Sequence, residues 1–99
     1  MEWLYCKGIP IEAQYLYRKA REMAGRGRDD AAMNYYRQAL IIAPTYAQAM
    51  FEMGNCFAHR GEYAEALVLY ERAISLNPES SDLKRARERV SFLNGNGRD

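Results

Sequence analysis

The side chains that most often do chemistry in proteins are scarce in this chain and lie far apart. His59 is the only histidine, and the two cysteines, Cys6 and Cys56, are fifty positions apart without a Cys-x-x-Cys spacing. A structural zinc ion takes about four ligands, so we expect neither a metal site nor a metal cofactor. One disulfide between the cysteines stays possible, but free thiols in a cytoplasmic, intracellular protein agree better with so few cysteines.

No sequence pattern typical of a catalytic site is present either. The stretch Gly25-Arg26-Gly27 looks like a piece of a phosphate-binding loop, but no strand pattern comes before it and no Lys-Ser/Thr pair follows it. A turn between helices explains this stretch better. We expect His59 on a solvated surface near a helix C-terminus, and Cys56 as an inert thiol packed between helices. The sequence therefore predicts a protein that is not an enzyme and that has no cofactor.

Length and charge limit the functions that remain. The chain has 99 residues, and its 14 Lys and Arg against 13 Asp and Glu give a formal net charge of +1. This length allows one domain with one modest core. The near-neutral charge argues against binding to nucleic acid or to an anionic membrane, and no run of about 20 apolar residues could cross a bilayer. The partners that remain are proteins or peptides.

The elements that must position any site become visible when the chain is compared with itself at an offset of 34 residues. Residues 11–44 and 45–78 align without a gap and share nine identical residues, as expected of a helical repeat protein. The identical pairs are Ala13/Ala47, Gln14/Gln48, Ala24/Ala58, Arg26/Arg60, Gly27/Gly61, Ala32/Ala66, Tyr36/Tyr70, Ala39/Ala73 and Pro44/Pro78. Because one such unit cannot bury both of its faces alone, the two units should stack.

The second unit predicts two helices joined by a glycine turn. Thr45 is the expected N-cap of the first helix, with Gln48 as its capping-box partner. Gly61 should end that helix, because glycine enters the left-handed conformation without cost. The second helix should begin near Glu62, whose charge suits a helix N-terminus, and should end before Pro78.

The first unit predicts the same elements. Pro10 suits the first turn of a helix that runs to about Gly25, Gly27 forms the turn, and Pro44 ends the second helix. Small residues recur in both units where the two helices face each other, so the backbones should approach closely. Tyrosines at the neighbouring positions, including Tyr36, should fill the remaining space with their apolar rings.

These units resemble the tetratricopeptide repeat, a helix–turn–helix unit with small, aromatic and proline residues at fixed positions. The positions that carry the resemblance are Ala20, Ala32, Tyr36, Ala39, Pro44, Gly54, Gly61, Ala66, Tyr70, Ala73 and Pro78. The resemblance implies an all-α fold, with two tetratricopeptide helix–turn–helix repeats and a C-terminal capping helix in a short right-handed α-solenoid. In the first unit, Lys19, Met23 and Asp29 depart from the family pattern, as suits an end unit with one face in water.

We expect the whole chain, 1–99, to form a single domain. Its parts are an apolar N-terminal arm (1–9), repeat 1 (10–46), repeat 2 (47–80), a capping helix (81–94) and a flexible tail (95–99) with turn and linker composition. The capping helix should cover the last repeat with Leu83, Ala86, Val90 and Leu93 and keep a charged face in water. The apolar start and the Gly-Asn-Gly end also agree with a piece of a longer repeat array.

In the tetratricopeptide family, a stripe along the first helices lines a concave groove that binds ligands, and the resemblance implies that role for the matching positions here. These positions are Gln14, Tyr17 and Arg21, then Gln48, Phe51, Asn55 and His59, and on the capping helix Asp82, Arg85 and Arg89. Tyr17 and Phe51 lie off the main apolar face, so we expect both to contact a bound peptide. If the three arginines converge, they favour an acidic partner.

Two functions remain open. The leading hypothesis is a non-enzymatic protein–protein interaction module, a scaffold whose concave groove binds a peptide segment of a partner. The alternative is a self-association module that forms a homo-oligomer through an uncovered repeat end or through the apolar arm with Trp3, Leu4 and Tyr5, because about three repeats are generally needed for a continuous core. The Lys/Asn and Lys/Arg pairs with which some family members grip chaperone tails are absent from the matching positions.

Overall fold

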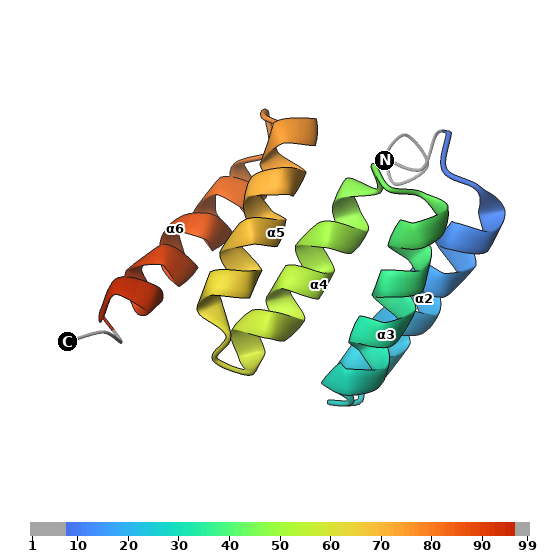
Figure 1. Ribbon diagram of the computed structural model, residues 1–99, viewed down its shortest axis with the longest axis horizontal. Coiled ribbons are helices and arrows are strands. Elements are labelled where there is room, and N and C mark those ends of the chain that lie inside the picture. The colour runs from blue at the N-terminus through green and yellow to red at the C-terminus, as the bar shows by residue number, and fades with distance from the viewer. Residues whose placement is uncertain (1–7, 97–99) are drawn as a thin grey trace.

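The computed structural model describes residues 8–96, and this part of the chain is all α-helical apart from its turns. The helices are α2 (Ile11–Gly25), α3 (Asp29–Ile42), α4 (Ala47–His59), α5 (Tyr63–Leu76) and α6 (Ser81–Asn96). Consecutive helices run in opposite directions, and the array places α2 and α6 at opposite ends (Figure 1). Its extents are 44 × 30 × 21 Å. The predicted all-α, solenoid-like stack is confirmed.

The helices pack as two pairs and a cap. α2 packs most closely against α3, and α4 against α5, while α3 joins the first pair to α4 and α5 joins the second pair to α6. Leu83, Ala86 and Val90 of α6 are at most 5% exposed, as predicted for the face of a capping helix. The prediction is wrong for Leu93, which is 39% exposed because the buried face of α6 ends at Val90.

The turns within the two repeats are those that the sequence predicts. Gly27 and Gly61 adopt φ values of 77° and 79°, in the left-handed region where a side chain would be strained. Glu62 is the residue that precedes α5. The second helices end at Ile42 and Leu76, two residues before each proline.

The predicted N-cap of α4 is wrong. Thr45 does not cap α4: the residue that precedes this helix is Tyr46, and no side chain caps it. Tyr46 is 2% exposed, and its carbonyl oxygen accepts hydrogen bonds from the backbone of Ala49 and Met50. Burial of the aromatic ring therefore sets the start of α4 in place of a hydroxyl cap.

The predicted tail is also wrong in part, because α6 continues through Asn96 and includes the first two residues of that segment. Residues 97–99 and most of the predicted arm, 1–7, lie outside the described residues. Of the arm, Gly8 and Ile9 are described. Ile9 is half-buried and packs against the core of the first repeat.

Three tyrosines lie at the centre of the helix packing. Tyr36, Tyr46 and Tyr70 are the largest side chains that are fully buried. In the first repeat the ring of Tyr17 lies between two of them, with centroid distances of 6.0 Å to Tyr36 and 5.1 Å to Tyr46. In the second repeat Tyr70 lies 5.9 Å from Phe51. Tilted aromatic pairs at such distances stabilise a core beyond their burial alone.

Candidate functional site

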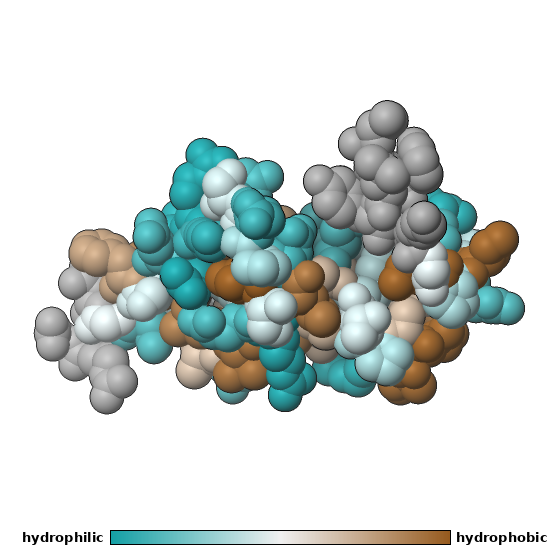
Figure 2. Space-filling model, turned by 90° about the horizontal axis from the view of Figure 1, so that it is seen from above, coloured by the Kyte–Doolittle hydropathy of each residue, from teal (hydrophilic) through white to brown (hydrophobic). Residues whose placement is uncertain are grey.

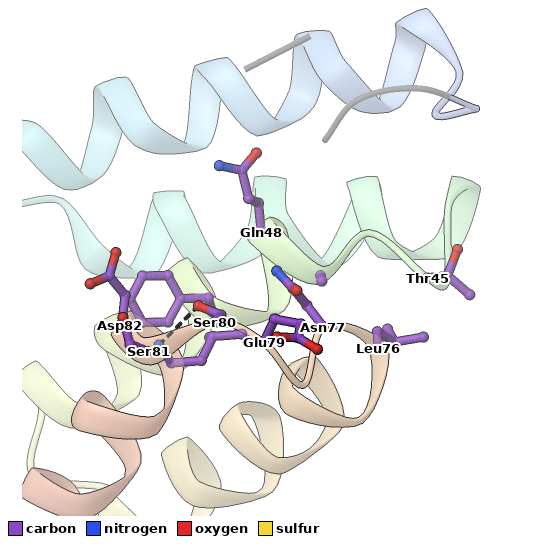
Figure 3. A pocket seen from close by; sticks show the side chains of 11 residues that line it. Thr45, Gln48, Leu76, Asn77, Glu79, Ser80, Ser81 and Asp82 are labelled. Atoms are coloured by element: carbon purple, nitrogen blue, oxygen red, sulfur yellow. Dashed lines mark hydrogen bonds between the residues drawn. The ribbon is translucent and has the colours of Figure 1, made fainter. Parts of the chain in front are cut away.

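A pocket of about 820 Å³ lies where α4 begins, beside the turn that joins α5 to α6 (Figure 3). Its lining residues are Thr45, Ala47, Gln48, Phe51, Leu76, Asn77, Glu79, Ser80, Ser81, Asp82 and Leu83. Gln48, Phe51 and Asp82 belong to the stripe expected from the repeat register. The fold thus brings together stripe positions from α4 and α6, and this pocket is the candidate site.

The pocket combines an apolar wall with a negatively charged border. Phe51 is half-buried, and Leu76 is 45% exposed, so both offer apolar surface. Glu79 and Asp82 contribute carboxylates, and none of the described lining residues is a lysine, arginine or histidine. A ligand here would meet apolar surface next to negative charge.

The turn that borders the pocket is held by local hydrogen bonds. The backbone N–H of Asn77 donates to the carbonyl oxygens of Ala73 and Ile74 at 2.9 and 3.1 Å, and Ser80 N–H donates to the Asn77 carbonyl at 3.2 Å. The Ser80 hydroxyl accepts a bond from the N–H of Leu83 at 3.2 Å. Ser80 therefore caps α6 in the manner typical of serine.

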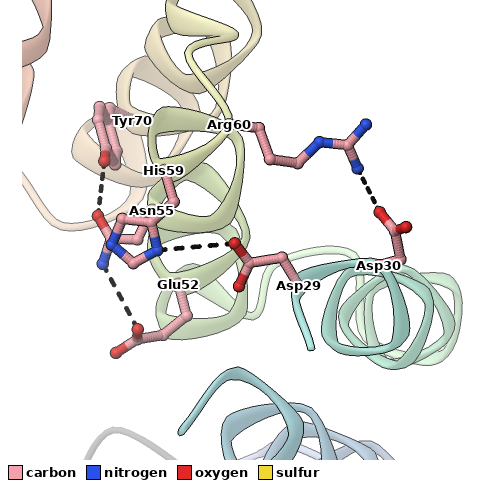
Figure 4. A network of polar contacts seen from close by, with 7 residues as sticks. All are labelled: Asp29, Asp30, Glu52, Asn55, His59, Arg60 and Tyr70. Carbon is pink, nitrogen blue, oxygen red and sulfur yellow. Dashed lines mark hydrogen bonds and ion pairs between the residues drawn. The ribbon is translucent and has the colours of Figure 1, made fainter. Parts of the chain in front are cut away.

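Beyond the pocket, a chain of hydrogen bonds fixes the middle of the stripe. The Tyr70 hydroxyl donates to Oδ1 of Asn55 at 2.6 Å, and Nδ2 of Asn55 donates to Oε1 of Glu52 at 3.4 Å (Figure 4). Burial raises the pKa of Tyr70, an effect that the positive charge of Arg89 opposes. Asn55 is half-buried, so its amide is oriented by these bonds while part of it stays accessible.

Tyr17 does not lie where the sequence analysis placed it. It is only 6% exposed and belongs to the core, so its expected position off the main apolar face is wrong. The reason is Tyr46, a residue outside the repeat pattern, whose ring covers Tyr17. Above the Tyr17 ring lies the guanidinium of Arg21, 5.9 Å from the centroid, and the interaction with Tyr17 raises the pKa of Arg21. Tyr17 thus supports an exposed arginine.

Two further stripe residues lie apart from the pocket. Gln14 donates from Nε2 to the carbonyl oxygen of Ile9 at 2.8 Å, and thereby ties the chain before α2 to that helix. The side chain of His59 is 72% exposed, as predicted, and its Nδ1 lies 3.8 Å from Oδ2 of Asp29 (Figure 4). Both side chains therefore have contacts within the protein.

The three arginines of the stripe do not converge. Arg21 belongs to α2, whereas Arg85 and Arg89 belong to α6, at the other end of the array (Figure 1). Nη2 of Arg85 lies 2.6 Å from Oδ1 of Asp82, so this guanidinium already has a carboxylate partner. A single arginine-lined site for one acidic group is therefore not formed.

The thiol of Cys56 is not poised to react. Cys56 is a free, buried thiol whose pKa burial raises to about 12, so it is protonated at neutral pH. No cluster of three or more His, Cys, Asp or Glu suited to a metal ion occurs among the described residues. A second hollow of about 540 Å³ at the Gly27 turn is bordered by charges of both signs, the arginines Arg28 and Arg60 and the carboxylates of Asp29 and Asp30.

Stacked antiparallel helix pairs with a covering helix define a helical repeat protein. A family model described as Tetratricopeptide repeat matches residues 47–80, and another model of the same description matches residues 13–46. The two matches cover more than half of the chain. The chain belongs to the tetratricopeptide repeat family, whose repeats generally mediate protein–protein interaction and are generally not enzymes.

The matches to individual proteins cover most of this chain but only a small part of the larger relatives. The chain is 33% identical to Protein O-mannosyl-transferase TMTC1 of Homo sapiens over 78 residues, which are 79% of this chain and 9% of the human protein. It is 26% identical to Small glutamine-rich tetratricopeptide repeat-containing protein 2 of Mycosarcoma maydis over 76 residues, 77% of this chain and 22% of that protein. The chain therefore spans less than a quarter of these two relatives.

An archaeal relative is closer in length. The chain is 28% identical to Uncharacterized protein MJ0572 of Methanocaldococcus jannaschii over 65 residues, 66% of this chain and 76% of that protein. Within the described residues, no helix combines the length and the apolar character that crossing a membrane demands. The family models thus identify the repeats, and neither they nor the relatives identify a binding partner.

Proposed function

We propose that this chain is a non-enzymatic interaction module that binds a peptide segment of a partner protein along the face formed by α2, α4 and α6. The observation that carries the proposal is the meeting of Gln48, Phe51 and Asp82, from two of these helices, in one pocket. Its volume of about 820 Å³ lies within the range of ligand pockets. The free, buried thiol of Cys56 supports the cytoplasm as the proposed location.

Phe51 is the anchor of the proposed interaction. Aromatic residues that are partly buried among neutral contacts often carry most of the energy of an interface. Gln48 and Asn55 flank Phe51 on α4 and can exchange hydrogen bonds with an extended peptide backbone. Because Tyr70 and Glu52 already hold the Asn55 amide, less side-chain entropy is lost when a peptide binds.

An acidic partner residue is proposed only for the α2 end of this face. Arg21 is exposed there, and the Tyr17 ring beneath it limits the conformations of its guanidinium. Glu52 lies close enough to raise the pKa of Arg21, so a partner carboxylate would share this arginine with Glu52. At the α6 end, Glu79 and Asp82 disfavour an acidic residue.

Self-association is a second candidate, and exposed apolar side chains support it. Ile11, Ile41, Ile42 and Leu76 are each more than 40% exposed, and all lie at the edge where α2 begins and where α3 and α5 end. From this edge, apolar groups stand in separate clusters among hydrophilic ones (Figure 2). Light scattering over a concentration series tests this candidate. A mass that increases with protein concentration in the wild-type chain, but stays that of a monomer in the Ile41→Asp variant, supports self-association. A monomer mass at every concentration of the wild-type chain rejects it.

Selection from a random peptide library tests the peptide-binding proposal. The selected peptides should bind the wild-type chain and bind the Ser81→Trp variant at least about tenfold more weakly, because an indole at this exposed position fills the pocket mouth. Ser91→Trp, on the same helix but outside the pocket, is the matched control and should bind normally. Equal binding by both variants would reject the proposed site.

A further inference from the structure

We propose that the pocket between α4 and α6 receives a cationic side chain, a lysine or an arginine, from the partner segment. The inference rests on the proposed peptide-binding function and specifies the residue type bound at one end of the face. Glu79 and Asp82 supply two carboxylates to the lining, and the described lining residues supply no positive side chain. The occupant that this charge complements is a cation.

At α6, the helix terminus does not reverse this charge. The N-terminus of α6 carries a partial positive charge, but Asp82 lies in its first turn and Ser80 already accepts the N–H of Leu83. Glu79 lies just before the helix and, within the described chain, has no ion pair. The carboxylate of Glu79 is therefore available to an incoming ammonium or guanidinium group.

The apolar part of the pocket suits the stem of the same side chain. Lysine and arginine cover apolar surface with their methylene groups while the charged end stays near water. Phe51 and Leu76 provide such surface next to the carboxylates. The ring of Phe51 can also attract a cation placed over its face. One long basic side chain thus complements both the apolar surface and the carboxylates of the lining. A purely apolar side chain or an acidic side chain would not complement both.

Arg85 gives an internal example of the proposed contact. Its guanidinium lies 2.6 Å from the Asp82 carboxylate, and the two side chains are 74% and 76% exposed. An ion pair this exposed is weak, so a partner cation can compete for Asp82. Arg85 then lowers the affinity of the pocket, and its removal should increase binding of a basic ligand.

The test uses two blocked dipeptides, acetyl-Leu-Arg-amide and acetyl-Leu-Glu-amide, titrated into the full ¹⁵N-labelled chain and followed by NMR. The arginine peptide should bind with a dissociation constant on the order of millimolar, as expected for so small a ligand. It should shift the amide signals of Ser80 to Leu83 and of Phe51. The glutamate peptide should bind more weakly. Equal binding of the two peptides would overturn the proposal.

Single substitutions then identify the groups responsible. Glu79→Gln and Asp82→Asn should each weaken binding of the arginine peptide about twofold to fivefold, the usual range for an exposed charge pair. Arg85→Gln should strengthen binding by a similar factor. Glu88→Gln, an exposed position on the same helix outside the pocket, should have no effect. If Arg85→Gln and Glu79→Gln, like the control Glu88→Gln, do not change the affinity for the arginine peptide, the pocket does not recognise charge.

The result is separable from the test of the proposed function. If library-selected peptides lose binding on Ser81→Trp while the two dipeptides bind alike, the face binds peptides and the cation inference is wrong. If the arginine peptide alone binds, with the expected response to Glu79→Gln, the cation inference is supported even where no library peptide is selected.

Discussion

Gly54 on α4 lies directly against the ring of Tyr70 on α5. A Cβ atom at Gly54 would be 2.8 Å from Cε1 of Tyr70 and 3.4 Å from the carbonyl oxygen of Ala66. Real Cβ atoms do not approach other atoms at the shorter distance, so glycine here sets the spacing of the two helices. The same tyrosine donates its hydroxyl proton to Asn55. The packing of the second repeat and the orientation of a candidate site residue therefore depend on one side chain.

Gly54→Ala should destabilise the chain by about 1–3 kcal/mol, because the added methyl group overpacks the contact with Tyr70. Gly25→Ala is the matched control: it also lies in a helix, and nothing lies within 4 Å of the added Cβ. This control should be neutral or stabilise by about 0.5–1 kcal/mol through helix propensity. Urea unfolding measures both. Equal free energies of unfolding for the two variants would show that Tyr70 moves aside without cost.

Tyr70→Phe should lower stability by about 0.5–1.5 kcal/mol through loss of its half-buried hydrogen bond to Asn55. Because the Asn55 amide loses one of its two partners and keeps only Glu52, binding of a selected peptide should also weaken. Tyr15→Phe removes a hydroxyl from a side chain that is 54% exposed and should change neither quantity. Calorimetry and peptide titration check the two effects, and identical behaviour of both variants would mean that the Tyr70 hydroxyl is dispensable.

Cys56 should resist thiol reagents in the native state, because burial raises its pKa to about 12 and hides the sulfur. A raised thiol pKa contributes stability that is intact below the unfolded pKa of about 8.5 and is lost as the pH rises toward the native pKa. In a Cys6→Ser background, labelling with a disulfide reagent should be slow at neutral pH and fast in denaturing urea. Rapid labelling of the native chain would contradict the buried position.

Arg60→Gln should cost less than about 1 kcal/mol, since its ion pairs are partly or fully exposed to water. Arg60 lies 2.5 Å from Oδ1 of Asp30 and 3.3 Å from Oε2 of Glu62, and the Asp30 side chain is 90% exposed. Exposed pairs contribute little and are screened by salt. The small loss should shrink further in high salt during thermal unfolding. A larger, salt-independent loss would mean that Arg60 holds the repeats together by other contacts.

The repeated positions are where sequence reasoning predicts the structure well. Gly27 and Gly61 mark turns that need positive φ, and prolines follow the second helices, because these requirements are local and recur in both units. Tyr46 has no aromatic counterpart in the other unit, so the repeat pattern does not reveal that it packs against Tyr17 and directly precedes α4. Leu93 fits the helical period of the buried face of α6. It is nevertheless exposed, because the buried face of α6 ends at Val90.

The candidate site divides in the same way. Gln48, Phe51 and Asp82 follow from the register of the first helices, because equivalent positions of a repeat share one face. Thr45, Asn77 and Glu79, which also line the pocket, come from the turns beside α4 and α6, and sequence reasoning missed them. The prolines and polar residues of these turns marked them as loops. Only the stacking of α6 beside α4 places the two turns around one pocket.

The most direct test of the central claim is NMR mapping of a library-selected peptide on the ¹⁵N-labelled chain. Binding along the face of α2, α4 and α6 predicts that the largest signal changes fall on Gln48, Phe51, Asn55 and Asp82. Exposed residues of α3 and α5, such as Asn34 and Val68, should change little. Changes concentrated on α3 and α5, with the signals of Phe51 and Asp82 unmoved, would contradict the account.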